Sequence, residues 1–201
     1  MSAMRRSSLS AALVALSGLL AWSAWWGEAG AAKKKPKERY YVQVVGAEAA
    51  AGVPKELADK ARAVLPELLA KRPEFVASLE GAPTDTDQLR KWLSKKKLRG
   101  FNIVVKLTKY AKELAPKPDS TKTQVLKISM SLQIFGTGIP DDTMAMTGDG
   151  VSAVGLEVGK TVRPKDEQVT TDETLRNALS SAIDDAVRKL AMGPPSKPQK
   201  R

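Results

Sequence analysis

The chain of 201 residues contains no cysteine and no histidine, and each absence excludes a class of chemistry. Without cysteine there are no disulfides, no zinc–thiolate sites, no iron–sulfur clusters and no lipid attached through a cysteine. Without histidine, the commonest general base, the Ser-His-Asp triad and imidazole ligation of metals are excluded. The remaining inventory favours a protein that is not an enzyme and that needs no cofactor or metal.

Apolar and basic residues are abundant. Hydrophobic residues make up 42% of the sequence, which is enough for a buried core in one domain or at most two. There are 33 lysines and arginines against 22 acidic residues, so the formal net charge is +11. A charge of this size bears on association with partners and on solubility, not on the fold.

Residues 1–31 have the pattern of a secretory signal peptide. Arg5 and Arg6 precede an uncharged segment, residues 9–26, and the small residues before Ala32 predict cleavage between Ala31 and Ala32. The alternative is a retained inner-membrane anchor formed by residues 9–26, because their length is near the lower limit for spanning a bilayer. Both interpretations place the rest of the chain across the membrane, as a periplasmic or secreted protein.

The remaining sequence divides into a basic tether (32–39), a single domain (40–192) and a polar tail rich in proline and lysine (193–201). Patterns of two-residue and 3.6-residue period predict the order strand–helix–strand–helix–strand–strand–strand–helix. This order indicates an α/β (α+β) fold, a mixed sheet of about five strands with helices packed on it and a C-terminal amphipathic helix. The predicted strands are 40–45, 75–79, 101–107, 124–135 and a strand from 144 to 158.

Several local features carry further expectations. Pro66 should kink or split the first helix, and Gly100 should stop the second. Gly148-Asp149-Gly150 suggests a bulge in the last strand, and the Thr170-to-Glu173 segment is a capping box for the last helix. That helix has an apolar stripe on one face, and its opposite face is predicted to be exposed to water. Because the stripe should be buried, we expect Ile183→Asp to unfold the domain. The stripe is Leu175, Leu179, Ala182, Ile183, Ala186 and Leu190, and the opposite face is Asp184, Asp185, Arg188 and Lys189.

Two short motifs resemble catalytic or nucleotide-binding signatures. Residues 155–161 look like the end of a phosphate-binding loop, but three residues separate the glycines where four are needed, and no helix is expected after them. Ser94 and Lys97 form a Ser-x-x-Lys without the partner motifs of penicillin-recognising enzymes. Paired aspartates are explained as caps, turns and a wet helix face. A calcium site at Asp141, Asp142 and Asp149 stays open as an alternative.

Basic residues gather on the second predicted helix and at its exit. Interleaved aromatics, which nucleic-acid binding favours, are limited here to Trp92, and export disfavours a nucleic-acid partner as well. The cluster is therefore a candidate site for an anionic partner in the envelope, a lipid headgroup, a glycan or an acidic protein. The alternative is that the charge only confers solubility. The candidate residues are Arg90, Lys91, Lys95, Lys96, Lys97 and Arg99.

The order of elements after the export signal resembles that of small periplasmic α/β modules of Gram-negative envelopes. Examples are the CsgG-like curli-secretion proteins, the penicillin-binding-protein activator lipoproteins and the N-terminal domain of TolB. The resemblance rests on residues 40–45, 57–69, 101–107, 124–135 and 175–190, and it implies a non-enzymatic binding or assembly role. The chain departs from the lipoproteins among them because it has no cysteine to lipidate.

The favoured hypothesis is thus an exported, non-catalytic binding or assembly module of the cell envelope. One alternative is a hydrolase that uses Ser and Lys or carboxylates without histidine. The other is a basic nucleic-acid binder.

Overall fold

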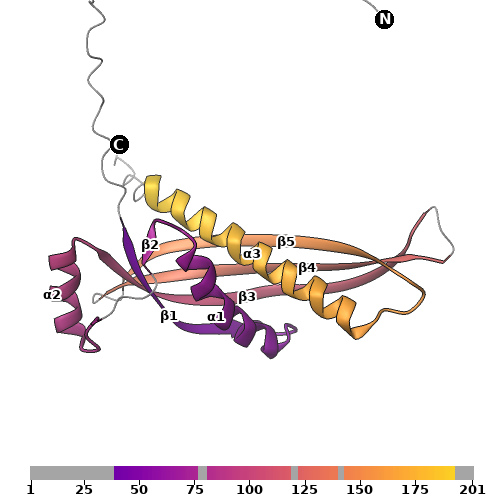
Figure 1. Ribbon diagram of the computed structural model, residues 1–201, viewed down its shortest axis with the longest axis horizontal. Helices are drawn as coiled ribbons and strands as arrows, with labels where there is room; N and C mark the ends of the chain where they lie inside the picture. The colour runs from indigo at the N-terminus through magenta and orange to yellow at the C-terminus, as the bar shows by residue number, and fades with distance from the viewer. Residues whose placement is uncertain (1–38, 77–80, 119–121, 140–142, 193–201) are drawn as a thin grey trace, which may run out of the picture. The chain divides into compact units, whose positions relative to one another are not determined.

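The framework of the protein is three long antiparallel strands, β3 (Arg99–Pro116), β4 (Gln124–Gly138) and β5 (Met144–Val158). The computed structural model describes residues 39–76, 81–118, 122–139 and 143–192 (Figure 1). Strand β4 alternates buried and half-exposed residues, as its sequence predicts, and Leu126, Ile128 and Leu132 are fully buried. The polar side chains between them lie on the other face of the sheet.

The first strand makes the sheet mixed. Strand β1 (Tyr40–Ala49) runs parallel to β3 on one side and to the short β2 (Phe75–Val76) on the other. The strand order is β2-β1-β3-β4-β5, with helices α1 (Lys55–Ala70), α2 (Thr86–Lys96) and α3 (Pro164–Met192). The predicted fold class, number of strands and order of elements are confirmed. Among the described residues, no helix combines the length and the apolar character needed to cross a membrane.

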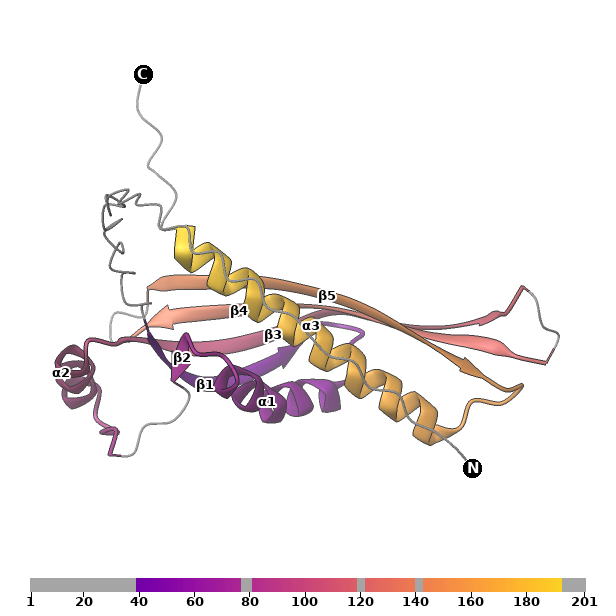
Figure 2. The ribbon, with the colours of Figure 1, turned by 45° about the horizontal axis from the view of Figure 1, so that its top comes forward.

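The three helices do not share one face of the sheet. Helices α1 and α3 lie together on one face, and α2 stands apart at one end (Figure 2). Successive residues of β1 show the division, because Tyr40 belongs to the core under α1 and α3 while Tyr41 packs against Leu89 and Leu93 of α2. Adjacent side chains of a strand point to opposite faces, so α2 packs on the face that α1 and α3 leave open, at the end where β1 and β3 begin.

Helix α3 approaches β5 closely enough to exclude side chains from the strand. A Cβ atom at Gly148 would lie 2.1 Å from the carbonyl oxygen of Ala182, and one at Gly150 would lie 2.1 Å from that of Ala178. The pairing of β5 with β4 runs through these glycines without a register shift, so the predicted bulge is wrong. The glycines serve a close approach of two backbones instead.

The start of α3 also differs from the prediction. The helix begins at Pro164, so the segment from Thr170 to Glu173 is not a capping box but lies in the helix interior. The hydroxyls of Thr170 and Thr171 donate to the carbonyl oxygens of Asp166 and Glu167, four residues earlier, at 2.7 and 2.8 Å. Threonine can satisfy its hydroxyl in this way inside a helix, so a threonine in a helical sequence need not mark the helix N-terminus.

Other boundaries differ by smaller amounts. Helix α1 is not split at Pro66, which lies on the exposed face, where water can satisfy the carbonyl group that loses its partner. Helix α2 ends at Lys96, so Gly100 does not stop it but belongs to β3. The predicted signal segment with Ala31 and Ala32, most of the tether, residues 77–80 and the tail lie outside the described residues.

Candidate functional site

Helix α2 separates its charges along its length. Its N-cap, Asp85, accepts a hydrogen bond from the backbone N–H of Gln88 at 2.9 Å, and Asp87 lies in the first turn. Lys95 and Lys96 occupy the last turn. Acidic residues at the start and basic residues at the end of a helix both complement its dipole. The helix is held to the sheet by Leu89 and Leu93, which leaves its charged side chains exposed.

The residue that ends α2 has an unusual backbone. Lys97 is left-handed, with φ of 56°, and it is the one non-glycine residue with positive φ in the described part of the chain. Its backbone N–H donates to the carbonyl oxygens of Leu93 and Ser94, as expected of a helix end closed by a left-handed residue. Glycine usually fills such a position, because a β-carbon there costs about 1–2 kcal/mol. A lysine therefore stands where glycine would be more stable.

We expect Lys97→Gly to raise the free energy of unfolding by about 0.5–1 kcal/mol, because it removes the β-carbon from a left-handed residue. Urea unfolding at neutral pH measures this change. Lys96→Gly is the matched control, since it removes the same charge inside the helix and should destabilise the protein by about 1 kcal/mol. A destabilised Lys97→Gly protein would contradict the assignment of the left-handed cap.

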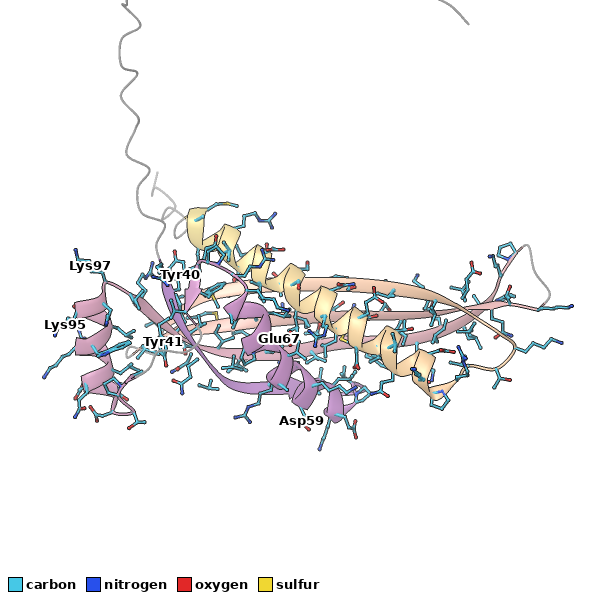
Figure 3. The ribbon with its side chains drawn as sticks, viewed as in Figure 1. Tyr40, Tyr41, Asp59, Glu67, Lys95 and Lys97 are labelled. Atoms are coloured by element: carbon cyan, nitrogen blue, oxygen red, sulfur yellow. The ribbon has the colours of Figure 1, made fainter. Side chains whose placement is uncertain are left out.

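The six predicted basic residues do come together, and all six are exposed. In the described part of the chain, no ion pair joins Arg90, Lys91 or any of the three consecutive lysines to an acidic side chain. Lys96 Nζ lies 5.8 Å from the centre of the Trp92 ring, and Figure 3 shows Lys95 and Lys97 extending away from the sheet. We call this set the α2 cation cluster: Arg90, Lys91, Lys95, Lys96, Lys97 and Arg99.

Two hollows adjoin the α2 cation cluster. One, of about 530 Å³, lies along the helix and is lined by Asp87, Arg90, Lys91 and Ser94. The other, of about 390 Å³, lies where α2 meets the ends of β3 and β4, and it combines Arg90 and Arg99 with the apolar Leu98 and Ile139. Exposed cations beside partly exposed apolar side chains are suited to an anionic group with an apolar neighbour.

The Ser-x-x-Lys motif has no catalytic geometry. Ser94 and Lys97 are both exposed, and the interaction that joins them is the helix-ending hydrogen bond from the Lys97 backbone to the Ser94 carbonyl oxygen, at 3.0 Å. Residues 155–161, which look like the end of a phosphate-binding loop, were excluded for two reasons, the spacing of the glycines and the lack of a following helix, and only the first reason holds. A helix does follow them, starting at Pro164, so that expectation is wrong, but Gly155 lies within β5 and the spacing remains unsuitable.

A second charged cluster ties α3 to the edge strand. Lys189 Nζ lies 2.9 Å from Asp149 Oδ2 and 2.7 Å from Asp185 Oδ2, and the backbone N–H of Asp149 donates to Asp185 at 3.0 Å. Gln133 donates to the other oxygen of Asp149 at 2.8 Å. Arg188 also pairs with Asp185. The predicted wet face of α3 is therefore wrong for Asp185, whose side chain is only 12% exposed.

This second cluster is suited to structure and not to acid–base catalysis. Hydrogen bonds from Lys189 and from the Asp149 backbone lower the pKa of Asp185 to about 2. Hydrogen bonds from Lys189 and Gln133 lower the pKa of Asp149. Carboxyl groups that stay ionised at neutral pH cannot act as general acids, and a lowered pKa also makes them weak general bases. No group of metal-ligating side chains occurs among the described residues, and Asp141 and Asp142 of the predicted calcium alternative lie outside them.

We expect Asp185→Asn to lower the free energy of unfolding at pH 7 by about 1–2 kcal/mol, since it removes a hydrogen-bonded charge. The folded pKa lies below the ordinary value, so the carboxylate stabilises the protein above about pH 4 and loses this effect as the pH falls toward 2. Urea unfolding at pH 7, 4 and about 2 should show the gap between the two proteins closing with acid. A gap that is constant with pH would contradict this role.

The comparisons with known proteins give no family. No family model and no curated protein matches the sequence. Similar solved structures include a DUF330-family protein from Xanthomonas campestris, at 7% identity and a TM-score of 0.47 over 81% of this chain and 93% of that one. A homolog of neuraminyllactose-binding hemagglutinin from Helicobacter pylori shares 10% identity, with a TM-score of 0.41 over 78% and 90% of the two chains. A minor lipoprotein from Acinetobacter baumannii shares 12%, with a TM-score of 0.35 over 81% and 100%.

None of these three is a CsgG-like protein, a penicillin-binding-protein activator or TolB, so that resemblance stays a prediction. The likeness to the three structures is slight, and it assigns no family and no function to this chain.

Proposed function

We propose that this protein is an exported, non-catalytic binding module of the cell envelope, and that the α2 cation cluster binds an anionic partner. The observation that carries the proposal is a group of exposed cations on helix α2 and at its C-cap, Arg90, Lys91, Lys95, Lys96 and Lys97, that form no ion pair with an acidic side chain in the described chain. The pattern of residues 1–31 supports export. Kinship with the periplasmic modules named above is part of the same proposal.

The cluster contrasts with many other basic residues of the domain, which have acidic partners close by. Cations elsewhere form ion pairs across α1, α3 and the strands, whereas those of the cluster repel one another along the helix. Solubility alone does not require that like charges be concentrated in one place. The paired residues are Lys60 with Asp172, Arg72 with Asp184, Lys112 with Glu167, Lys117 with Glu157 and Arg176 with Glu67.

The test measures binding of the full chain, in a non-ionic detergent, to soluble fluorescent polyanions, poly-glutamate and dextran sulfate. We expect the triple variant Lys95→Gln, Lys96→Gln, Lys97→Gln to bind both at least about tenfold more weakly, because three cations at one surface act together. Binding by the unmodified chain should weaken as salt rises toward physiological strength.

The matched control removes three exposed lysines that likewise have no ion pair within the described residues but lie on the strands: Lys106→Gln, Lys109→Gln, Lys127→Gln. The two triple variants have the same net charge, so a cluster-specific effect separates them. Equal loss in both variants would show that only net charge matters and would overturn the proposed function.

A further inference from the structure

We infer that the partner of the α2 cation cluster is a membrane surface of acidic lipid headgroups, on which one end of the sheet docks. This inference rests on the proposed function, and it selects one class of anionic partner. Three features of the structure carry it: the position of the cluster in the fold, the points at which the chain enters and leaves, and the apolar residues beside the cations.

The cluster lies at the end of the sheet where several elements begin or finish. The register pairs Tyr40 with Arg99, Phe101 with Gly138 and Thr137 with Met144, so the starts of β1, β3 and β5 meet the end of β4. Figure 3 shows Tyr40 and Lys97 at this end. Helix α3 finishes there too, because its later residues Ala182 and Ala186 cover Gly148, near the start of β5 (Figures 1 and 2).

The segments that precede β1 and follow α3, residues 1–38 and 193–201, are therefore both joined to this end of the sheet. Residues 32–39 contain five basic residues and one acidic residue, and residues 193–201 contain three basic residues and no acidic one. They join the described domain at Arg39 and Met192, so both basic segments start from the end that carries the cluster. Basic residues near an anionic leaflet are each attracted to it, so their number at one end of the domain favours docking by that end.

The opposite end of the sheet is different. At the far end of the hairpin of β3 and β4, Lys112 pairs with Glu167 at 2.7 Å and Lys117 pairs with Glu157 at 2.6 Å. The charges of these two lysines are compensated within the protein. Lys127, Lys160 and Lys165 near that end are exposed without an ion pair in the described chain, but they are fewer than the cations of the cluster and come from three separate segments, so that end has less to gain from an anionic surface. Within the described residues, the Tyr40 end therefore has the larger group of exposed cations without an ion pair, namely Arg90, Lys91, Lys95, Lys96 and Lys97.

A lipid surface suits this end better than a soluble polymer because apolar groups accompany the cations. Trp92 is half-buried beside Lys96, and Leu98 and Ile139 line the hollow next to Arg99. Tryptophan and the stems of lysine and arginine favour the boundary between headgroups and acyl chains. The uncharged residues 9–26 precede this end, and the chain between Trp26 and Arg39 reaches at most about 47 Å.

The absence of cysteine makes the test direct, because one introduced cysteine can be labelled alone. Gln88→Cys places a donor dye on the exposed face of α2 outside the cluster, and Ala115→Cys places it at the far end of the hairpin. Each full-length protein is reconstituted into vesicles that contain an acceptor on the headgroups. The vesicles are phosphatidylcholine with or without phosphatidylglycerol, and energy transfer reports which end of the domain approaches the surface.

We expect transfer from labelled position 88 to exceed that from position 115, and we expect this difference to increase clearly when phosphatidylglycerol is present, beyond what the attachment of residues 9–26 produces in neutral vesicles. The Lys95, Lys96, Lys97 triple variant should lower the docking constant roughly 100-fold, while the Lys106, Lys109, Lys127 control should lower it far less. Equal transfer from both positions, or the same transfer in neutral and acidic vesicles, would overturn the inference. If the vesicle experiment fails but binding of soluble polyanions still depends on the three lysines, the proposed function stands and only the lipid partner is wrong. If binding of soluble polyanions does not depend on these lysines either, both proposals fail.

Discussion

Gly150→Ala is expected to lower the free energy of unfolding by about 3 kcal/mol or more, although it adds only one methyl group. The new Cβ would lie 2.1 Å from the carbonyl oxygen of Ala178 and 2.9 Å from the Cβ of Ala182. Neither neighbour can rotate away, since one is helix backbone and the other has no further side-chain atoms. Helix α3 must therefore move off β5, which opens the core that Leu175, Leu179 and Ile183 form with the sheet.

Urea unfolding followed by circular dichroism measures this change, and the strand supplies its own control. Gly155→Ala introduces the same methyl group into β5, but its nearest neighbour would be the Val125 Cγ1 at 3.5 Å, an ordinary contact. Neither glycine has positive φ, so the backbone accepts alanine at both positions. We expect Gly155→Ala to change stability by less than about 0.5 kcal/mol. Similar midpoints for the two variants would show that α3 can adjust its distance from the strand.

Ile183→Asp is expected to abolish cooperative folding. Ile183 is 2% exposed and lies in the main core between α3 and the sheet. An uncompensated carboxylate there costs several kcal/mol in addition to the lost apolar burial, and typical domains are stable by only about 5–15 kcal/mol. The variant should lose the fixed near-ultraviolet circular dichroism of its aromatic residues and unfold without a sharp transition in urea.

Val169→Asp controls for adding a negative charge to the same helix. Val169 is 53% exposed, so its replacement buries no charge and removes little apolar contact. We expect its unfolding midpoint to stay close to that of the unmodified protein. A soluble Ile183→Asp protein that unfolds cooperatively at the normal midpoint would contradict the packing of α3 described above.

The predictable parts of the fold are those in which a strong periodicity coincides with burial. Alternating Leu126, Ile128, Met130, Leu132 and Ile134 define β4, and the stripe through Leu179 and Ile183 defines α3. These patterns suffice for the fold class and the order of elements because each element buries one face. The pairing of β1 with β3 has no such local signal, since it joins residues that are far apart in the chain.

The mistaken details concern residues whose local preference and tertiary role differ. Gly148 and Gly150 favour a bulge locally, but they are small because a helix lies on them. Thr170 favours a helix start locally, but its hydroxyl is satisfied one turn earlier within the helix. In both cases the missing information is the identity of the neighbouring element, which one segment of sequence does not contain.

In the candidate site, too, features set by local sequence were predictable, and features set by contacts between distant segments were not. The six cations of the α2 cluster lie within ten residues of sequence, on helix α2, at its C-cap and at the start of β3, so their proximity was predictable. The hollow beside them was not predictable, because one of its apolar lining residues, Ile139, directly follows β4 and is far from α2 in the sequence. The contact of Asp185 with Asp149 was missed because it needs the register of α3 against β5, for which the closely spaced pair of glycines in β5 was the only signal.

The position of β1 in the sheet has a consequence for folding kinetics. Strands β3, β4 and β5 follow one another along the chain, so two short loop closures form their hairpins. Strand β1 must instead pair with β3 across the whole segment that contains α1, β2 and α2, as the match of Tyr40 with Arg99 shows. Contacts of long sequence separation form slowly, so the hairpins with α3 should form first and the insertion of β1 between β2 and β3 should limit the folding rate.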